Sequence, residues 1–256
     1  MGIGKTKRER RNDLRSMARR IAAVLFVGMM IVASLHLYNY LTTSERFAIT
    51  HVEFEGLSRV DDEGISALLR DLHGQNLFLA PLKSYEARVE AHSRVAEATL
   101  HRVPPDRVTC TVREREPVAL VFTDHFLEVD ATGVVMEEDE FTALLDLPII
   151  TGISADDVRP GRRSDSPQLR GALDALTACK VLGGSFAADI SELRVSDGGI
   201  TIQSLSRNCV LVLGNGDYER KLRKYFVLRD EIAPRERTAW LIDLRFEDQV
   251  VLRGRI

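Results

Sequence analysis

Residues 21–41 read IAAVLFVGMMIVASLHLYNYL, and this stretch decides the layout of the chain. It contains no Asp, Glu, Lys or Arg, and about 20 such residues in a helix are long enough to cross the hydrocarbon core of a bilayer. Tyr38 and Tyr40 lie near its C-terminal end, as is typical of aromatic residues at a membrane interface. The sequence therefore predicts a transmembrane helix at residues 21–41.

The first 20 residues are strongly basic. They hold eight Lys or Arg residues against two acidic ones, a net charge of +6, whereas the whole chain carries −3. Because basic flanks stay on the cytoplasmic side, we predict a cytoplasmic tail at residues 1–20 and an extracytoplasmic remainder from about residue 45. A signal peptide cleaved near Ala33 or Ser34 is one alternative, and a nucleic-acid-binding tail is another. We favour the membrane helix, because the apolar run continues to Leu41 and topology already explains the charge.

The rest of the chain is long enough to fold. About 210 residues follow the membrane stretch, which suffices for one large or two small domains. A hydrophobic content of 45% supports well-packed cores. The three cysteines, Cys110, Cys179 and Cys209, show no CxxC spacing, which argues against a disulfide framework and a zinc site. We interpret them as small buried hydrophobic residues, with one oxidised pair as the alternative.

Residues 47–115 have the pattern of a compact β-α-α-β-β module. Two predicted helices separate the first strand from the second. The first begins at Asp61-Asp62 and ends at His73-Gly74, and the second, capped by Ser84, buries Tyr85 and Val89. The predicted strands are 47–54, 95–103 and 108–112. Two helices on one face of a three-stranded sheet make an α+β domain.

Residues 116–256 are predicted to form a second, mainly antiparallel α+β domain, after a charged, proline-containing boundary at 113–117. Asp197-Gly198-Gly199 indicates a hairpin turn. The predicted strands are 118–122, 126–129, 134–136, 148–152, 190–195, 199–205, 210–213, 240–246 and 249–252. We interpret 148–152 as a buried, edge-like segment and 153–164 as a surface loop.

Two helices are expected in the second domain. The first spans residues 169–182 and is stopped by Gly183-Gly184. The second begins at Asp217 and ends at Pro234. Its basic residues, Lys221, Arg223 and Lys224, are expected mostly on the solvent face.

The sequence contains no GxSxG, HExxH, P-loop or SxxK motif. Gly214-Asn215-Gly216 before a helix suggests a phosphate cradle, but the segment lacks the third glycine and a following Lys, Ser or Thr, so a plain loop is favoured. The acidic run 136–140 suggests a cation site, although a solvated surface is the simpler interpretation. We predict no catalytic, cofactor or metal site, and therefore no enzyme.

Seven segments, in this order, resemble the FtsQ/DivIB family of bacterial division proteins. They are FAITHVEFEG at 47–56, GQNLF at 74–78, RVPP at 102–105, VREREPVA at 112–119, VDATGVV at 129–135, LPIITG at 147–152 and WLIDLRF at 240–246. Ser93 departs from the pattern, because the family commonly has proline there. The resemblance covers nearly the whole chain and implies a POTRA domain at 47–115 followed by an FtsQ-type β domain at 116–256.

The resemblance also implies a function without catalysis. Such a protein is a single-pass scaffold in the cell inner membrane at the division septum, with its bulk in the periplasm. It links the small subunits FtsB and FtsL to the septal peptidoglycan synthesis machinery. Further implied partners are other division proteins such as FtsI, FtsW, FtsK and FtsN, whereas no cofactor, nucleic acid or small-molecule substrate is implied.

An exposed strand edge can pair with an incoming strand through main-chain hydrogen bonds. We hypothesise that strand 240–246 and its follower 249–252 offer the edge that FtsB uses, with Trp240 and Phe246 as aromatic anchors and Arg245 or Arg253 facing partner carboxylates. The predicted contact residues are Trp240, Leu241, Ile242, Asp243, Leu244, Arg245, Phe246, Val250 and Arg253. The alternative is that Trp240, Ile242 and Leu244 fill the core of their own domain.

Three further interpretations remain. The strand edge of the POTRA domain is a second candidate surface, for localisation or for contact with other division proteins. A POTRA-containing envelope assembly or secretion factor is a rival class, although such proteins usually carry several repeats and a barrel. A membrane-anchored periplasmic enzyme is the other rival, and the absence of a catalytic motif disfavours it.

Overall fold

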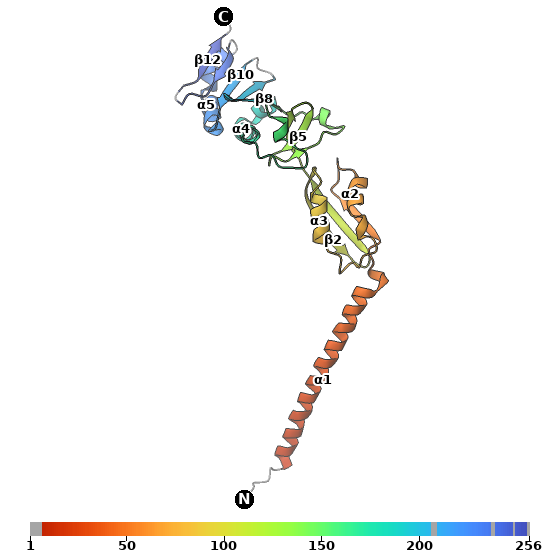
Figure 1. Cartoon of the computed structure of the whole chain (residues 1–256). Helices are drawn as coiled ribbons and strands as arrows, with labels where there is room; N and C mark the ends of the chain where they lie inside the picture. The colour runs from red at the N-terminus through yellow and green to blue at the C-terminus, as the bar shows by residue number, and fades with distance from the viewer. Residues whose placement is uncertain (1–6, 206–208, 237–238, 248, 255–256) are drawn as a thin grey trace. The chain divides into compact units, whose positions relative to one another are not determined.

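The computed structural model describes residues 7–205, 209–236, 239–247 and 249–254. Within them the chain forms two compact units (Figure 1). The first unit contains residues up to 57 together with 61–87 and 98–112. The second unit contains 58–60, 88–97 and the chain from 113 onward. Each unit is described by itself below.

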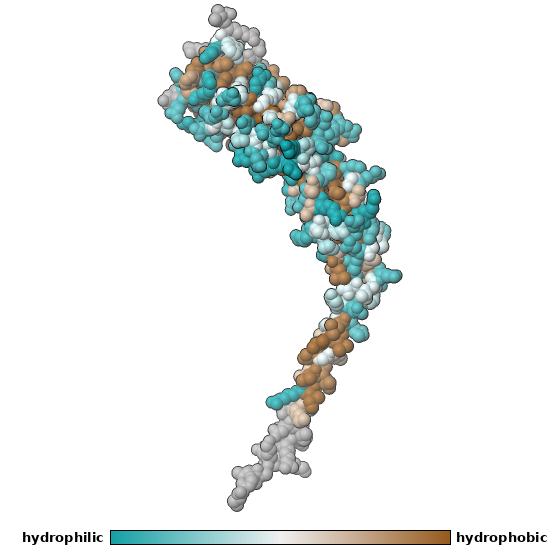
Figure 2. Space-filling view, viewed as in Figure 1, coloured by the Kyte–Doolittle hydropathy of each residue, from teal (hydrophilic) through white to brown (hydrophobic). Residues whose placement is uncertain are grey.

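The first unit begins with α1 (Lys7–Thr43), a single helix of 37 residues. Its part Arg19–Thr43 is long and apolar enough to cross a membrane, at about 37 Å for 1.5 Å per residue. The side chains from Arg19 to Tyr40 are exposed all round the helix, and Figure 2 shows a continuous apolar band along it. The predicted transmembrane stretch therefore lies inside a longer helix.

The elements that follow α1 have the predicted β-α-α-β-β order. They are β1 (His51–Glu55), α2 (Asp62–Leu68), η2 (Arg70–Leu72), α3 (Leu82–Glu90), β2 (Val95–Val103) and β3 (Arg107–Glu114). The three strands form a sheet in the order β1-β3-β2, with β1 parallel to β3. Tyr85 and Val89 are buried as predicted, and the core also contains Ile49, Ile65, Leu72 and Val108.

The beginning of this module differs from the prediction. The chain leaves α1 through the 3-10 turn η1 (Glu45–Phe47), because the Ser44 side chain accepts from the Arg46 N–H and turns the backbone. Strand β1 therefore begins at His51 rather than at Phe47. Between them, Ala48 forms an isolated antiparallel bridge with Asn76.

The expected helix caps were only partly right, because Asp61 holds the N-cap position of α2 but Ser84 does not cap α3. Asp61 makes no side-chain cap hydrogen bond to α2. The hydroxyl of Ser84 donates instead to the carbonyl oxygen of Pro81, at 2.8 Å, and lies inside α3. The first helix also breaks at Leu69, after which the chain continues as η2.

The second unit is built on one nine-stranded sheet in the order β12-β11-β10-β9-β8-β7-β4-β5-β6. Pairing is antiparallel except at β4–β7, β7–β8 and β10–β11, so the sheet is mainly antiparallel, as predicted. The strands are β4 (Pro117–Phe122), β5 (Phe126–Asp130), β6 (Val135–Met136), β7 (Ile149–Thr151), β8 (Ile190–Ser196), β9 (Gly199–Ser204), β10 (Val210–Gly214), β11 (Ala239–Asp243) and β12 (Val251–Gly254).

Helices α4 (Pro167–Gly183) and α5 (Tyr218–Glu236) pack against each other and against strands of this sheet. Phe186, in the 3-10 segment η5 (Gly184–Asp189), contacts the rings of Tyr225 and Phe226 on α5. The shared core buries apolar side chains from both helices and from most of the strands. The α+β prediction is therefore confirmed.

Three local predictions for this unit were wrong. Segment 148–152 is no edge: β7 lies between β4 and β8 and is parallel to both. The 153–164 loop is not purely a surface segment, because Ile153 and Val158 enter the core around the 3-10 turn η4 (Ala155–Asp157). Helix α5 continues past Pro234 to Glu236, since a proline so near the end of a helix interrupts only its last turn.

Two glycines in the quoted sequence motifs are required by the backbone. Gly56 and Gly152 have φ of +85° and +83°, where glycine carries no steric penalty. A Cβ at Gly56 would lie 2.2 Å from the carbonyl oxygen of Val112, and one at Gly152 would lie 2.0 Å from that of Val195. Both turns therefore bring the chain against a neighbouring strand more closely than any side chain allows.

Candidate partner-binding edge

The free edge of the large sheet is β12, not β11. Strand β11 is paired on both sides, in parallel with β10 and antiparallel with β12. Of the two strands expected to offer the edge together, 240–246 and its follower 249–252, only the follower lies at the edge, because β12 covers the outer side of β11. Among the described residues, β12 has no strand on its outer side, and it lies at the end of the sheet in Figure 1.

The pairing of β11 shows which backbone N–H and C=O groups of β12 point outward. Leu244 donates its N–H to the Val212 carbonyl of β10 at 2.9 Å, so the backbone N–H and C=O groups of Ile242 and Leu244 point toward β10. The backbone N–H and C=O groups of successive residues point to opposite sides of a strand, so those of Leu241 and Asp243 point toward β12. Their partners are Arg253 and Val251, whereas Leu252 lies opposite Ile242. Leu252 therefore turns its N–H and C=O outward, where an incoming strand can pair with them.

The predicted contact residues divide into three groups by burial. Ile242, Asp243 and Leu244 are buried, and Ile242 and Leu244 belong to the core shared with the helices. Leu241 and Val250 are half-buried, and Val250 packs against that core. The accessible side chains are those of Trp240 (41% exposed), Phe246 (43% exposed), Arg245 and Arg253.

Arg245 is already engaged within its own chain. Its Nε donates to Oδ1 of Asp243 at 2.9 Å, and its Nη2 donates to Oδ2 at 2.6 Å. These hydrogen bonds outweigh burial and hold the pKa of the Asp243 carboxyl below its usual value. Of the two predicted cations, Arg253 on β12 is therefore the better candidate for a partner carboxylate.

Two lysines of α5 hold the loops that follow β10 and β11. Nζ of Lys221 donates to the carbonyl oxygens of Leu213, Asn215 and Gly216 at 2.8–2.9 Å. Nζ of Lys224 donates to the carbonyl oxygens of Phe246, Glu247 and Gln249. The expected solvent-facing position is wrong for Lys221, which is buried because its ammonium satisfies three carbonyl groups. The 214–216 loop thus points carbonyl oxygens at the Lys221 ammonium. A phosphate cradle would need backbone N–H groups instead, so this interpretation is disfavoured.

Replacing Lys221 with methionine should leave those three carbonyl oxygens without their donor. Burial lowers the pKa of the Lys221 ammonium, and the group donates three hydrogen bonds to carbonyl oxygens. We expect Lys221→Met to lower the free energy of unfolding by about 2 kcal/mol, a typical value for hydrogen bonds to a charged group. The measurement is the urea midpoint followed by the fluorescence of Trp240, the chain's single tryptophan.

Arg223→Met on the same helix is the matched control for this substitution. Arg223 contacts Glu219 on the surface, and such pairs contribute less than about 1 kcal/mol. Equal urea midpoints for Lys221→Met and Arg223→Met would show that the carbonyl contacts of Lys221 do not stabilise the fold.

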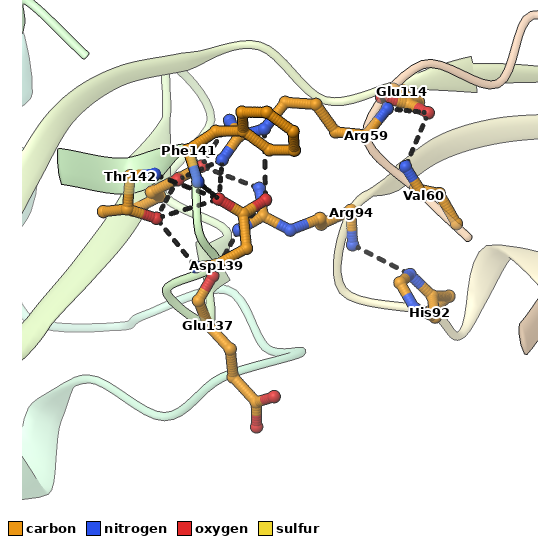
Figure 3. A network of polar contacts seen from close by, with 10 residues as sticks. Arg59, Val60, His92, Arg94, Glu114, Glu137, Asp139, Phe141 and Thr142 are labelled. Carbon is orange, nitrogen blue, oxygen red and sulfur yellow. Dashed lines mark hydrogen bonds and ion pairs between the residues drawn. The ribbon is translucent and has the colours of Figure 1, made fainter. Parts of the chain in front are cut away.

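A buried network of ion pairs forms at the other end of the same sheet (Figure 3). The fully buried Glu128 of β5 accepts from Nη1 of Arg94 at 2.8 Å and from Nη2 of Arg59 at 2.6 Å. Asp139 contacts the same two guanidinium groups, and the hydroxyl of Thr142, in η3 (Thr142–Leu144), donates to Glu128 at 2.6 Å. This network binds residues 58–60 and 88–97 into the second unit.

Two more carboxylates support this end of the sheet. Glu114 accepts the backbone N–H groups of Ser58, Arg59 and Val60. Asp130 pairs with Nη1 of Arg115 at 2.9 Å. One face of β5 buries Leu127 and Val129 in the core, and its other face buries Glu128 and Asp130 under arginines.

The sequence interpretation missed this network. The acidic run 136–140 is not simply solvated, because Asp139 belongs to the cluster and the Glu137 carbonyl accepts from Arg94. The available signal was Glu128 itself: a charge between Leu127 and Val129 in a strand requires a partner once both faces are covered.

The described residues show no metal-binding cluster. No group of three or more His, Cys, Asp or Glu side chains suited to a metal ion occurs among them. Cys110, Cys179 and Cys209 are all buried, as the sequence interpretation expected. Burial raises the pKa of the Cys110 thiol to about 11 and that of Cys179 to about 12, which keeps both thiols protonated and unreactive at neutral pH.

Comparison with known families matches both parts of the sequence that follows α1. The family model "POTRA domain, FtsQ-type" matches residues 47–115. The model "Cell division protein FtsQ/DivIB, C-terminal" matches residues 119–245. These are families of cell division proteins rather than of known enzymes.

Similar proteins carry the same description. The chain is 30% identical to a "Cell division protein FtsQ" of Syntrophotalea carbinolica over 79% of this chain and 72% of the relative. It is 28% identical to a protein of that name from Myxococcus fulvus, over 95% of this chain and 91% of the relative. A third, from Anaeromyxobacter sp., is 30% identical over 84% of this chain and 74% of the relative. The chain therefore belongs to the FtsQ/DivIB family of cell division proteins.

Proposed function

We propose that this protein is a non-catalytic scaffold of the division machinery that spans the cytoplasmic membrane once through α1. The basic residues before the apolar stretch favour a cytoplasmic N-terminus. They therefore support an extracytoplasmic location for the proposed POTRA domain, 47–115, and C-terminal domain, 116–256. The family membership supports recruitment to the division septum. The observation that carries the binding mechanism is the uncovered outer edge of β12 among the described residues.

The proposed partner adds a strand to β12. Main-chain groups of Leu252 would pair with the incoming strand, while the exposed rings of Trp240 and Phe246 and the guanidinium of Arg253 would contact its side chains. FtsB, together with FtsL, is the proposed partner, and FtsI, FtsW, FtsK and FtsN are candidates for other surfaces. Ile242 and Leu244 support this edge from the core rather than by touching the partner.

The membrane helix contributes to this mechanism through concentration. Two proteins that each carry one membrane helix search a surface rather than a volume, which raises their effective concentration. A form lacking α1 should therefore retain binding in solution and lose much of its activity in cells.

Leu252→Pro tests the strand-addition mechanism. Proline removes the outward N–H of Leu252 but none of the hydrogen bonds between β11 and β12. We expect the affinity of the full-length protein for the FtsB extracytoplasmic segment to fall about 100-fold, or ~2.7 kcal/mol. The measurement is a binding titration in detergent micelles, accompanied by hydrogen exchange of the β11 amides.

Leu252→Ala is the control, because the Leu252 side chain packs partly against the core and its loss must be separated from that of the N–H. The alanine variant should bind within a few-fold of the wild type, and protection of β11 should be similar in both variants. Equal affinities for Leu252→Pro and Leu252→Ala would contradict pairing at this edge.

A further inference from the structure

A loop of the first unit is bonded directly to the end of the membrane helix. The side-chain amide of Asn76 donates to the carbonyl oxygen of Leu41 at 2.8 Å. Leu41 is the last residue of the apolar stretch. The loop at residues 76–80 therefore lies at the level where α1 leaves the hydrocarbon core, if α1 spans the membrane as proposed.

Aromatic rings continue this contact from the helix onto the loop. The ring of Tyr40 on α1 meets that of Phe47 edge-on, with centroids 5.8 Å apart. Phe47 meets the ring of Phe78 at 5.2 Å in the same manner. Tyr40, Phe47 and Phe78 thus form a row of aromatic rings that begins on the proposed membrane helix and ends on the loop.

The loop exposes two large apolar side chains at this point. Phe78 is 38% exposed and Leu79 is 57% exposed, whereas their neighbours Leu77 and Ala80 are buried. A globular domain in water has no structural need for two adjacent exposed residues of this size, and their position beside α1 suggests a specific environment.

The backbone of the loop is firmly held, so these side chains are not exposed through looseness. Nε of Arg102 donates to the Leu77 carbonyl oxygen at 2.7 Å, and its Nη2 donates to that of Ala80 at 2.8 Å. Oδ1 of Asn76 accepts the N–H of Phe78 at 3.0 Å and that of Leu79 at 3.3 Å. The loop presents Phe78 and Leu79 in a fixed position.

We propose that Phe78 and Leu79 insert into the interfacial layer of the bilayer beside α1. This layer favours aromatic and apolar side chains near polar groups, and the neighbouring Tyr38 and Tyr40 have the character of an aromatic belt. Two exposed cations lie near these apolar residues in sequence: Arg46 in η1 directly precedes Phe47, and Lys83 in α3 follows the 76–80 loop. Both suit lipid phosphates. The first unit then has two attachments to the membrane, α1 and the 76–80 loop.

Photo-crosslinking in the full-length protein tests this membrane contact. p-Benzoylphenylalanine replaces Phe78 in one sample and Phe122 in another, and each is reconstituted in vesicles of phosphatidylcholine and phosphatidylglycerol. Phe122, on β4, is a matched aromatic control that is 42% exposed. We expect at least a tenfold larger yield of lipid adduct at position 78 than at position 122, measured by mass spectrometry.

Equal lipid yields at the two positions, or an adduct at position 78 mainly with a second protein chain, would overturn the proposal. Hydrogen exchange of β2 shows whether the Phe78 variant is folded, and if it is not, the same comparison is made at the more exposed Leu79. Extraction by alkaline carbonate separately tests whether α1 spans the bilayer. Failure of that premise is thus distinguished from failure of the loop contact.

Discussion

Glu128→Gln is expected to lower the free energy of unfolding of the second unit by about 3–5 kcal/mol, the usual loss when one partner of a buried ion pair is removed. Glu128 is fully buried and contacts both Arg94 and Arg59. After the substitution, Asp139 alone would face two guanidinium groups. Glutamine keeps the shape of the side chain, so the loss reports charge rather than packing.

The measurement is a urea titration of the full-length protein in detergent, followed by the fluorescence of Trp240. This single tryptophan lies in the second unit and therefore reports its unfolding. Hydrogen exchange of the β5 amides gives a local check, and protection should fall by about two to four orders of magnitude for a loss of this size.

Glu97→Gln is the matched control for this substitution. Glu97 pairs with Arg113 at 3.2 Å, but both side chains are mostly exposed, so we expect a change of less than about 1 kcal/mol. Similar losses for Glu97→Gln and Glu128→Gln would show that burial of the network does not matter. The affinity of the folded Glu128→Gln variant for FtsB should stay near the wild-type value, since six strands separate β5 from β12.

The sequence was sufficient to predict the elements with strong local signals. Strand β2 has the predicted bounds, Val95–Val103, because apolar residues alternate along it and prolines follow it directly. The Asp197-Gly198 turn pairs Ser196 with Gly199 as a two-residue hairpin, for which Asp-Gly is a typical sequence. The order of elements in the first unit followed from such signals.

Local sequence patterns did not predict which strands lie next to each other in the sheet. Segment 148–152 was expected to be edge-like, yet β7 lies inside the sheet, and of the two strands expected to form the other edge only the follower, β12, lies there. The pairing of β7 with β4 and β8 joins residues about 30 to 40 positions apart in parallel, and nothing within a short apolar segment specifies that choice. For the candidate site, the sequence therefore indicated the region but not the strand that forms its edge.

The polar interactions were the least predictable part of the structure. Lys221 and Arg223 are two residues apart on α5, yet one is buried against carbonyl oxygens and the other is exposed. The difference depends on where the 213–216 loop passes, which is a property of the whole fold. The pairing of Arg59 with Glu128 likewise joins residues 69 positions apart.

Acid is expected to destabilise the second unit through the same carboxylates. Burial alone would raise the pKa of Glu128, but hydrogen bonds from Arg94, Arg59 and Thr142 outweigh it and hold that pKa below its usual value. Hydrogen bonds likewise prevail over burial at Asp130, which accepts from Thr132, Val134 and Arg115, and at Asp139, which accepts from Arg59 and Phe141. Each group therefore binds its proton more weakly in the folded state than in the unfolded state.

The sign of the pH dependence follows from this difference. Unfolded carboxyl groups titrate near pH 4, so above about pH 5 both states are ionised and the stabilisation is complete. As the pH falls below that value, the unfolded chain takes up protons first, and stability is lost progressively through the lowered pKa values of the folded state. We expect these carboxylates to cost the second unit little stability between pH 7 and about 5.5, and roughly 1–3 kcal/mol between about pH 5.5 and 3.5. The measurement is the urea midpoint across this range.

Variants of the network identify the groups responsible. Glu128→Gln removes one titrating carboxylate, so its stability should fall less steeply with acid than that of the wild type, although it begins lower. Glu97→Gln should follow the wild-type curve. A urea midpoint that stays constant down to about pH 4, or equal slopes for all three proteins, would show that these buried carboxylates are not what acid titrates. If stability depends on pH as expected in the three proteins, the carboxylates on the arginine-paired face of β5, Glu128 and Asp130, are the acid-sensitive groups of the second unit.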